Sequence, residues 1–342
     1  MLAFITGVAG TALAQDERSF VKEASPWGLI IFKRNVADAD TLRRLIGDFR
    51  SAVGWQAPVL VDQEGGRVQR LTPPHWPAYP PSASYGALYD RDRAKGLAAA
   101  KLGARLIAAD LATVGIDVDC APVADVPAAG ADPIIGDRAY GMAADKVAAV
   151  AGAFAAGLLE GGVLPVLKHM PGHGRATVDS HQSLPVVNAD RASLEATDFA
   201  AFRPLATLPL GMTAHVVFSA FDPVAPATTS ATIVRDVIRD SIGFAGCLMS
   251  DDVSMGALSG SLSERTRAAI SAGCDMVLHC NGKFAEMLAV AAAAPQLAGQ
   301  ALRRATAALA LRQPAAPIDL DGRRAEFLAL MAGVLKPAPG SA

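Results

Sequence analysis

The segment Val163-Leu164-Pro165-Val166-Leu167-Lys168 joins an apolar run directly to His169-Met170-Pro171-Gly172-His173-Gly174, which is polar and rich in turn-forming residues. Short apolar runs of this kind are typical of strands that are buried on both faces of a parallel sheet. Further runs occur along the chain at residues 3–8, 28–32, 59–61, 118–123, 211–217, 247–250 and 276–279. The sequence therefore predicts eight buried strands.

Helical patterns lie between these runs. In residues 40–53, apolar Leu42, Leu45, Ile46 and Phe49 recur at the spacing of one helix face. Further helices are expected at residues 93–114, 144–159, 230–242, 263–272 and 323–335. Eight strands alternating with helices favour a closed barrel over an open doubly wound sheet, and no Gly-x-Gly-x-x-Gly motif follows the first strand.

The prediction is an α/β protein with a single-domain (β/α)8 TIM-type barrel. The domain is expected to span residues 1–342, with the barrel core at about 2–313 and a C-terminal strap and helix at 314–342. Hydrophobic residues make up 51% of the 342 residues, so the chain can bury a large core.

Charge and cysteine content exclude several classes of partner. The net charge is −2 and no basic cluster is evident, which argues against nucleic acid or an anionic membrane surface. Four cysteines lack the spacing of a zinc site or a disulfide framework, and this usage is typical of a reducing compartment. They are Cys120, Cys247, Cys274 and Cys280.

The amino terminus resembles a signal peptide in one respect, because residues 1–15 are apolar and end near Ala12-Leu13-Ala14. It lacks the basic start that a signal peptide needs, and Gly7 and Gly10 interrupt the apolar stretch. Residues 2–8 are therefore predicted to form the first barrel strand, and the protein is expected in the cytoplasm.

Polar residues follow the predicted strands, at the end of a barrel where active sites lie. Asp62 to Arg70 follow the third strand, Asp132 to Arg138 lie in the loop after the fourth, and Lys168 to Gly174 end the fifth. Five of the six histidines also fall at strand ends or in the loops after them, namely His169, His173, His181, His215 and His279. We expect one polar site at this rim.

Asp179 and His181 are two residues apart in a predicted loop, so both can converge on one point. A carboxylate on one ring nitrogen fixes the tautomer of a histidine and raises its basicity, as in many acid/base catalysts. The same pattern fits a Ser/Asp turn that carries a surface histidine.

Asp251 ends an apolar strand, where a carboxylate is costly unless it is paired, bound to a metal or catalytic. Asp252 follows it, and successive strand residues point to opposite faces. Only one of the two is therefore expected to face a substrate.

Three strings in the sequence resemble those of the family 3 glycoside hydrolases. They are Lys168-His169-Met170-Pro171-Gly172-His173-Gly174, Asp179-Ser180-His181 and Ser250-Asp251-Asp252-Val253-Ser254-Met255. The resemblance extends from residue 2 to about 282 and is greatest to single-domain bacterial β-N-acetylglucosaminidases of peptidoglycan recycling. Met170, Arg175 and Val253 depart from the usual residues, and Arg175 could alter the mobility of its loop.

The resemblance implies a barrel enzyme that retains the β configuration through a covalent glycosyl-enzyme. By match to the family motifs, Asp251 is the nucleophile, and His181, assisted by Asp179, is the acid/base on a mobile loop. The positions that hold the sugar hydroxyls are matched by Asp62, Arg70, Arg138, Lys168 and His169. The expected substrate is a muropeptide or disaccharide with a terminal N-acetylglucosamine, cleaved without metal or cofactor by a monomer or weak dimer.

Three other functions compete with this one. A metallohydrolase could use His169, His173 and Asp179, although Pro171 and Gly172 prevent the two histidines from sharing a helix. A glycoside phosphorylase on the same scaffold would suit a neutral histidine, which repels phosphate less than a carboxylate does. A sugar-binding module without activity would need neither the Asp251 carboxylate nor the Asp-His pair.

Overall fold

The computed structural model describes residues 1–314 and 317–334, and its centre is a closed barrel of parallel strands. Around the barrel the strands follow the order β1-β12-β11-β9-β7-β6-β3-β2. Their bounds are β1 Leu2–Thr6, β2 Pro26–Ile31, β3 Val59–Val61, β6 Val118–Asp119, β7 Leu164–Met170, β9 Leu210–Thr213, β11 Cys247–Asp252 and β12 Met276–His279. All eight predicted strands take part, and the predicted barrel is confirmed.

Two of these strands end four residues earlier than predicted. The strand expected at 118–123 is regular only as far as Asp119; beyond it, Cys120 N–H still donates to the Val61 carbonyl, and a single bridge joins Val123 to Lys168. The strand expected at 211–217 ends at Thr213. Beyond it, β10 (Val217–Phe218) pairs instead with β8 (Val186–Val187) outside the barrel.

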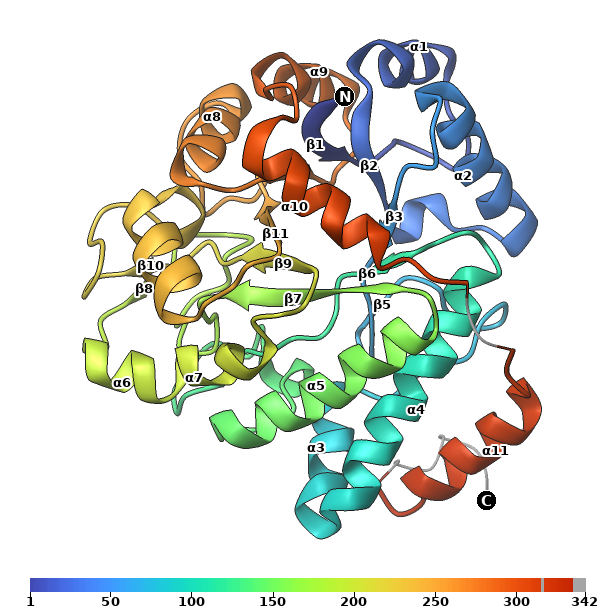
Figure 1. The fold of residues 1–342 in the computed structure, drawn as a ribbon, viewed down its shortest axis with the longest axis vertical. Helices are drawn as coiled ribbons and strands as arrows, with labels where there is room; N and C mark the ends of the chain where they lie inside the picture. The colour runs from blue at the N-terminus through green and yellow to red at the C-terminus, as the bar shows by residue number, and fades with distance from the viewer. Residues whose placement is uncertain (315–316, 335–342) are drawn as a thin grey trace.

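Helices surround the strands, as Figure 1 shows. Four of them occupy the predicted positions, with small shifts at their ends: α2 Ala39–Val53, α4 Arg93–Ala112, α5 Ala144–Glu160 and α8 Leu262–Ala272. The segment predicted as a helix at 230–242 contains a π-helix at Ile233–Ser241. Helices that the periodicity did not indicate are α1 Gln15–Ala24, α3 Ser82–Arg91, α6 Arg191–Ala196, α7 Asp198–Phe202, α9 Phe284–Ala293 and α10 Gly299–Ala310.

Helix α10 closes the amino end of the barrel. Its Ala305 and Ala308 belong to the same buried cluster as the barrel residues Leu164, Leu210 and Cys247, and Figure 1 shows it lying across the strands. The cavity described below opens at the other end of the barrel, where the strands finish.

The C-terminal helix α11 (Leu320–Met331) packs on α4, and its Phe327 ring lies 6.2 Å from that of Tyr85. The helix was predicted at 323–335, and position 335 lies outside the described residues, as do 315–316 of the predicted strap. The domain limits of 1–342 remain a prediction. Among the described helices, none combines the length and the apolar character that crossing a bilayer would require.

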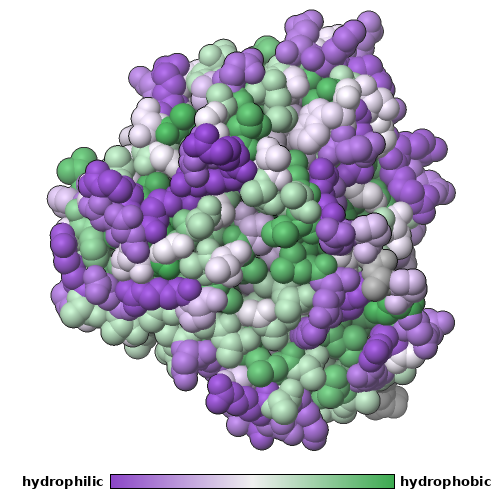
Figure 2. Space-filling view, in the orientation of Figure 1, coloured by the Kyte–Doolittle hydropathy of each residue, from purple (hydrophilic) through white to green (hydrophobic). Residues whose placement is uncertain are grey.

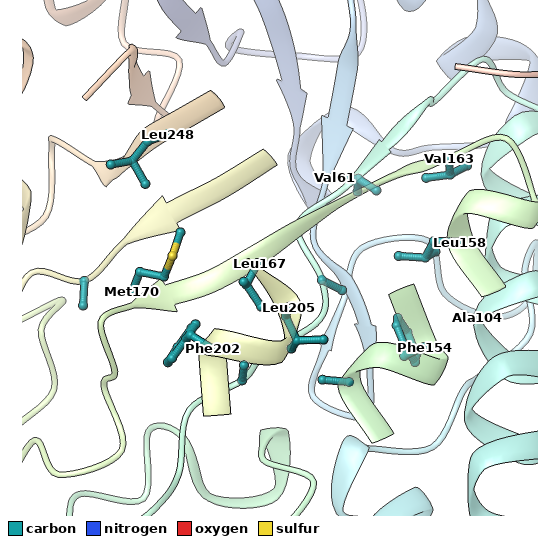
Figure 3. Packing of buried hydrophobic residues seen from close by; sticks show 14 of the residues in the cluster. Val61, Ala104, Phe154, Leu158, Val163, Leu167, Met170, Phe202, Leu205 and Leu248 are labelled. Carbon is teal, nitrogen blue, oxygen red and sulfur yellow. The ribbon is translucent and has the colours of Figure 1, made fainter. Parts of the chain in front are cut away.

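The surface carries hydrophilic side chains around its edge, with hydrophobic residues between them (Figure 2). The main core lies between the barrel and its helices. Figure 3 shows Leu167 and Met170 of β7 in this core, together with Leu248, Phe202 and Leu205.

Gly211 of β9 leaves the space that the Met170 side chain fills. A Cβ atom at this position would meet Met170 Cε and would lie 2.7 Å from Cζ of the Phe244 ring. The thioether is flexible enough to move, but a buried ring is not.

We expect Gly211→Ala to lower the free energy of unfolding by about 1–3 kcal/mol, because it overpacks the core. Urea denaturation measures this change. Gly47→Ala in α2 is the matched control, since a Cβ atom there meets no atom within 4 Å. Equal stability of the two variants would show that the core around Met170 is not tightly packed.

Candidate active site

A cavity of about 310 Å³ opens at the carboxyl end of the barrel. Seven of the eight predicted site residues line it, from four strands and the loops that follow them: Asp62, Arg70, Arg138, Lys168, His169, His181 and Asp251. The eighth, Asp179, contacts His181 behind the lining. Apolar side chains complete the wall, among them Ile30, Phe32, Ile135, Met212, Met255 and Leu278.

Lys168 lies at the centre of a buried ionic network. Only 2% of its side chain is exposed, and its ammonium nitrogen lies 2.9 Å from Asp62 Oδ1 and 2.7 Å from Glu64 Oε1. Arg138 donates two hydrogen bonds to Glu64, at 2.8 and 2.9 Å, and Arg70 donates one to Asp62 at 2.8 Å. Every charge in this network therefore has an opposite partner.

Burial opposes ionisation of these groups, but their partners outweigh it. The pKa of Glu64 falls to about 2 because burial is more than offset by Arg138 and Lys168, and the pKa of Asp62 is lowered in the same way by Lys168 and Arg70. The pKa of Lys168 is raised, since Asp62 and Glu64 offset its desolvation. All three stay charged at neutral pH.

Glu64 is a site residue that the sequence pattern does not single out. It lies in β4 (Gln63–Gly65), which pairs with β5 (Val68–Gln69) in a hairpin directly after β3. Glu64 follows Asp62 by two residues, and in an extended chain such residues have side chains on the same side. Strand alternation is therefore the sequence signal that could have identified Glu64 as a site residue.

Asp119 is a second buried carboxyl beneath this network. It ends β6, and its Oδ1 accepts the backbone N–H of Gln63 at 3.0 Å. Burial raises its pKa to about 8, because the single hydrogen bond and the charge of Lys168 do not offset the desolvation. It therefore adds little negative charge below pH 8.

Asp125 holds two histidines in place. Its Oδ2 lies 2.7 Å from His169 Nδ1, and its Oδ1 accepts the backbone N–H of His173 at 2.7 Å. The other ring nitrogen of His169, Nε2, lies 3.5 Å from the Arg138 guanidinium. Asp125 thus fixes the orientation of the His169 ring, which lines the cavity. Carboxylates often orient functional histidines by bonding one ring nitrogen in this way.

Asp251 and Asp252 both line the cavity, so the expectation that only one faces it is wrong. The reason is a bulge in β11: Met249 pairs with Met276, whereas Asp252 pairs with Leu278, and the extra residue breaks the alternation. The two carboxylates still differ. Asp252 accepts hydrogen bonds from Ser254 and from the Cys280 backbone, while Asp251 accepts only its neighbour's N–H among the described contacts.

The pKa of Asp251 is lowered, although burial opposes its ionisation. The largest offsetting influences are His215 and His169, followed by the N–H of Asp252. His215 is fixed in turn by hydrogen bonds to Thr228 Oγ1 at 2.7 Å and to the Asp252 carbonyl at 2.9 Å. An ionised carboxylate to which no cation of residues 1–314 or 317–334 is directly bonded therefore faces the cavity.

The Asp179–His181 pair forms at the mouth of the cavity. Asp179 Oδ1 lies 2.8 Å from His181 Nδ1 and also accepts the His181 backbone N–H at 2.9 Å. The His181 side chain is 61% exposed. The Asp179 carbonyl also accepts N–H groups of Gln182 and Ser183, so the segment is a turn that carries an oriented histidine.

Arg175, a departure from the usual family residue, anchors the start of this loop. Its Nε lies 2.6 Å from Asp198 Oδ2 and its NH2 group 2.8 Å from Thr197 Oγ1. Asp198 begins α7 and is buried, and its Oδ2 also accepts a hydrogen bond from Thr197 Oγ1 at 2.7 Å, so the guanidinium adds an opposite charge to a buried carboxylate.

The three residues that a metallohydrolase could use as metal ligands contact other side chains instead. His169 contacts Asp125, His173 Nε2 contacts Ser180, and Asp179 contacts His181. Within residues 1–314 and 317–334, no group of three or more His, Cys, Asp or Glu side chains is arranged to hold a metal ion.

Comparisons with known proteins agree with this geometry. The model of the glycosyl hydrolase family 3 N terminal domain matches residues 3–308. A β-hexosaminidase of Alkalilimnicola ehrlichii is 39% identical over 279 residues, covering 80% of this chain and 79% of its own length, and that of Aromatoleum aromaticum is 34% identical over 318, covering 92% and 89%. NagZ of Neisseria gonorrhoeae, solved with N-trifluoroacetyl-D-glucosamine, superposes with a TM-score of 0.83 at 30% identity, covering 97% of this chain and 96% of that one.

We expect Glu64→Gln to lower the free energy of unfolding by about 3–5 kcal/mol, because it leaves Arg138 and Lys168 buried with one carboxylate fewer. Urea denaturation at pH 7 measures the change. The control is Asp40→Asn, which breaks an exposed pair with Arg43 and should cost below about 1 kcal/mol. Similar losses in both variants would mean that the network contributes little.

Proposed function

Because this chain belongs to glycosyl hydrolase family 3 and is a β-N-acetylhexosaminidase, we propose that it is a retaining exo-β-N-acetylglucosaminidase. Its substrates are fragments of the bacterial cell wall that end in N-acetylglucosamine, and it cleaves them through a covalent glycosyl-enzyme. Support for the sugar comes from the neighbouring structure, whose ligand is an N-acyl glucosamine.

The observation that carries the proposal is the state of Asp251. The other cavity-lining carboxylates are engaged: Asp62 is held by Lys168 and Arg70, and Asp252 accepts hydrogen bonds from Ser254 and the Cys280 backbone. Asp251 has a lowered pKa and no cation bonded to it among the described contacts, so it presents a free lone pair to the cavity. This is the state that a nucleophile for an anomeric carbon needs.

The remaining cavity residues bind the sugar. Arg70, Arg138 and Lys168 keep spare N–H groups beyond those used on Asp62 and Glu64, and Asp62 and His169 add acceptors and donors. Their mutual pairing fixes them before a substrate arrives, which lowers the cost of ordering them on binding. A cavity of about 310 Å³ is at the small end of ligand pockets and fits one terminal sugar.

His181 serves as the acid and then the base. When Asp251 attacks the anomeric carbon, the bond to the leaving oxygen breaks and that oxygen takes a proton from His181. In the second step the neutral imidazole removes a proton from water, which attacks the same carbon and releases Asp251. Asp179 stabilises the charged ring and holds its orientation.

A cytoplasmic location stays part of the proposal and rests on cysteine chemistry. All four thiols are buried and unpaired, which suits a reducing compartment.

We expect an aryl β-N-acetylglucosaminide to be turned over far faster than the matching aryl β-glucoside, with no dependence on phosphate. Release of the aryl alcohol in phosphate-free buffer, with phosphate then added back, measures both points. A rate that rises with phosphate and yields a sugar 1-phosphate would instead identify a glycoside phosphorylase.

We expect Asp251→Ala to lose activity by a factor of about 10³ or more while folding normally, because the covalent step is removed. Asp252→Ala, which breaks supporting hydrogen bonds to Ser254 and Cys280, should retain more activity. A mechanism-based fluorosugar should label the peptide that contains Asp251, as seen by mass spectrometry. If no adduct forms and a thiazoline analogue binds tightly, the acetamido group of the substrate is the nucleophile instead.

A further inference from the structure

Ser180 lies between the two residues of the proposed acid/base pair and, like His181, is among the residues that line the cavity. The side chains of Asp179 and His181 are 23% and 61% exposed, whereas Ser180 is only 3% exposed. The loop thus presents the pair toward the cavity mouth and buries the residue between them. The proposed chemistry has no use for a buried hydroxyl at this position.

The buried hydroxyl contacts His173. Ser180 Oγ lies 2.9 Å from His173 Nε2, and the His173 side chain is buried. Burial lowers the pKa of His173 to about 4, so the ring is neutral at pH 7 and carries one N–H. Among the described residues its Nδ1 has no hydrogen-bond partner. A bare lone pair costs less than a bare N–H, so the Nε2–H donates to Ser180.

His173 is itself held firmly. Its backbone N–H donates to Asp125, the carboxylate that also orients His169 at the cavity wall. Ser180 is therefore connected through His173 to Asp125. Asp125 is completely buried and is already held by its contact with His169 of the cavity wall.

The same loop is bonded to the segment that follows Asp251. Gly256 N–H donates to the His181 carbonyl at 3.2 Å, and Ala257 N–H donates to the Ser180 carbonyl at 3.2 Å. A Cβ atom at Gly256 would lie 2.9 Å from the carbonyl oxygens of both His181 and Gln182. Only glycine lets the two backbones approach so closely.

We propose that Ser180, His173 and Gly256 are positioning residues, which together latch the loop of the acid/base pair against the segment of the nucleophile. The inference rests on the proposed roles of His181 and Asp251. The latch fixes the separation between His181 and Asp251. Gly256, at one end of the latch, follows Asp251 by five residues, and Ser180, at the other end, is adjacent to His181. A general acid must lie within hydrogen-bond reach of the departing oxygen, so small displacements are costly.

Ser180→Ala removes the hydroxyl with little change in volume. We expect kcat/KM, which reports the step that breaks the glycosidic bond, to fall by roughly tenfold on an alkyl β-N-acetylglucosaminide, whose leaving group needs a proton, and by less than about twofold on a 2,4-dinitrophenyl glycoside, which does not. KM for the alkyl glycoside should change little, because none of the residues proposed to hold the sugar is altered. Ser51→Ala, at an exposed position of α2, should leave both rates unchanged.

Gly256→Ala should give the same dependence on the leaving group, since it pushes the His181 carbonyl away. Gly47→Ala is its matched control, with open space at the new Cβ. Thermal unfolding of each variant confirms that it folds. If Gly256→Ala does not fold, the Ser180→Ala kinetics decide alone.

His181→Ala, measured in parallel, separates the two levels of the proposal. If His181→Ala lowers kcat/KM equally for both substrates, His181 is not the general acid and the proposed mechanism fails. If His181→Ala discriminates between substrates but Ser180→Ala slows both alike or neither, the mechanism stands and the latch is wrong. The latch is also wrong if the activity lost in Ser180→Ala is explained by a lower melting temperature alone. A purely structural role would lower activity on both substrates, whatever their leaving group.

Discussion

The buried ammonium of Lys168 is the constraint on which the site depends. An isolated charge at this depth would cost several kcal/mol, so Lys168 requires Asp62 and Glu64, and these in turn require Arg70 and Arg138. Because β7 supplies the lysine and the segment after β3 supplies both carboxylates, the pairing joins two strands that are separated only by β6. The cavity is therefore rigid where a sugar would bind, and its polar groups are oriented in advance.

Against this rigid floor, the proposed acid/base pair is carried on a loop at the surface. The proposed role of His181 requires it to give and take a proton, and its solvent-facing position keeps it in exchange with water. A loop at the surface has fewer contacts that hold its side chains in one position. Arg175 anchors the beginning of the loop to α7, and the buried Ser180 and the close approach at Gly256 hold its tip. Precision at the mouth thus comes from buried contacts within the loop and its neighbours rather than from the Asp179–His181 pair itself.

The barrel was predictable from the sequence because its strands are buried on both faces and appear as unbroken apolar runs. Site residues at strand ends, such as Asp62, Lys168 and Asp251, followed from the same topology. Contacts between distant segments did not, since no local pattern joins His173 to Ser180 or Glu64 to Arg138. The orientation of Asp252 was mispredicted because a bulge depends on the register of the neighbouring strand. Helices α9 and α10 were not predicted, although both are rich in alanine, a strong helix former.

The closure of the barrel also sets a condition on synthesis. Phe4 in the first strand pairs with Val277 in the last, so β1 keeps an unpaired edge until most of the polypeptide has left the ribosome. The plug α10 is made later still. Nascent chains therefore carry an open, apolar sheet edge for much of translation, when such edges favour aggregation. Chaperone demand should consequently peak late, shortly before the last strand emerges, rather than being spread evenly over elongation.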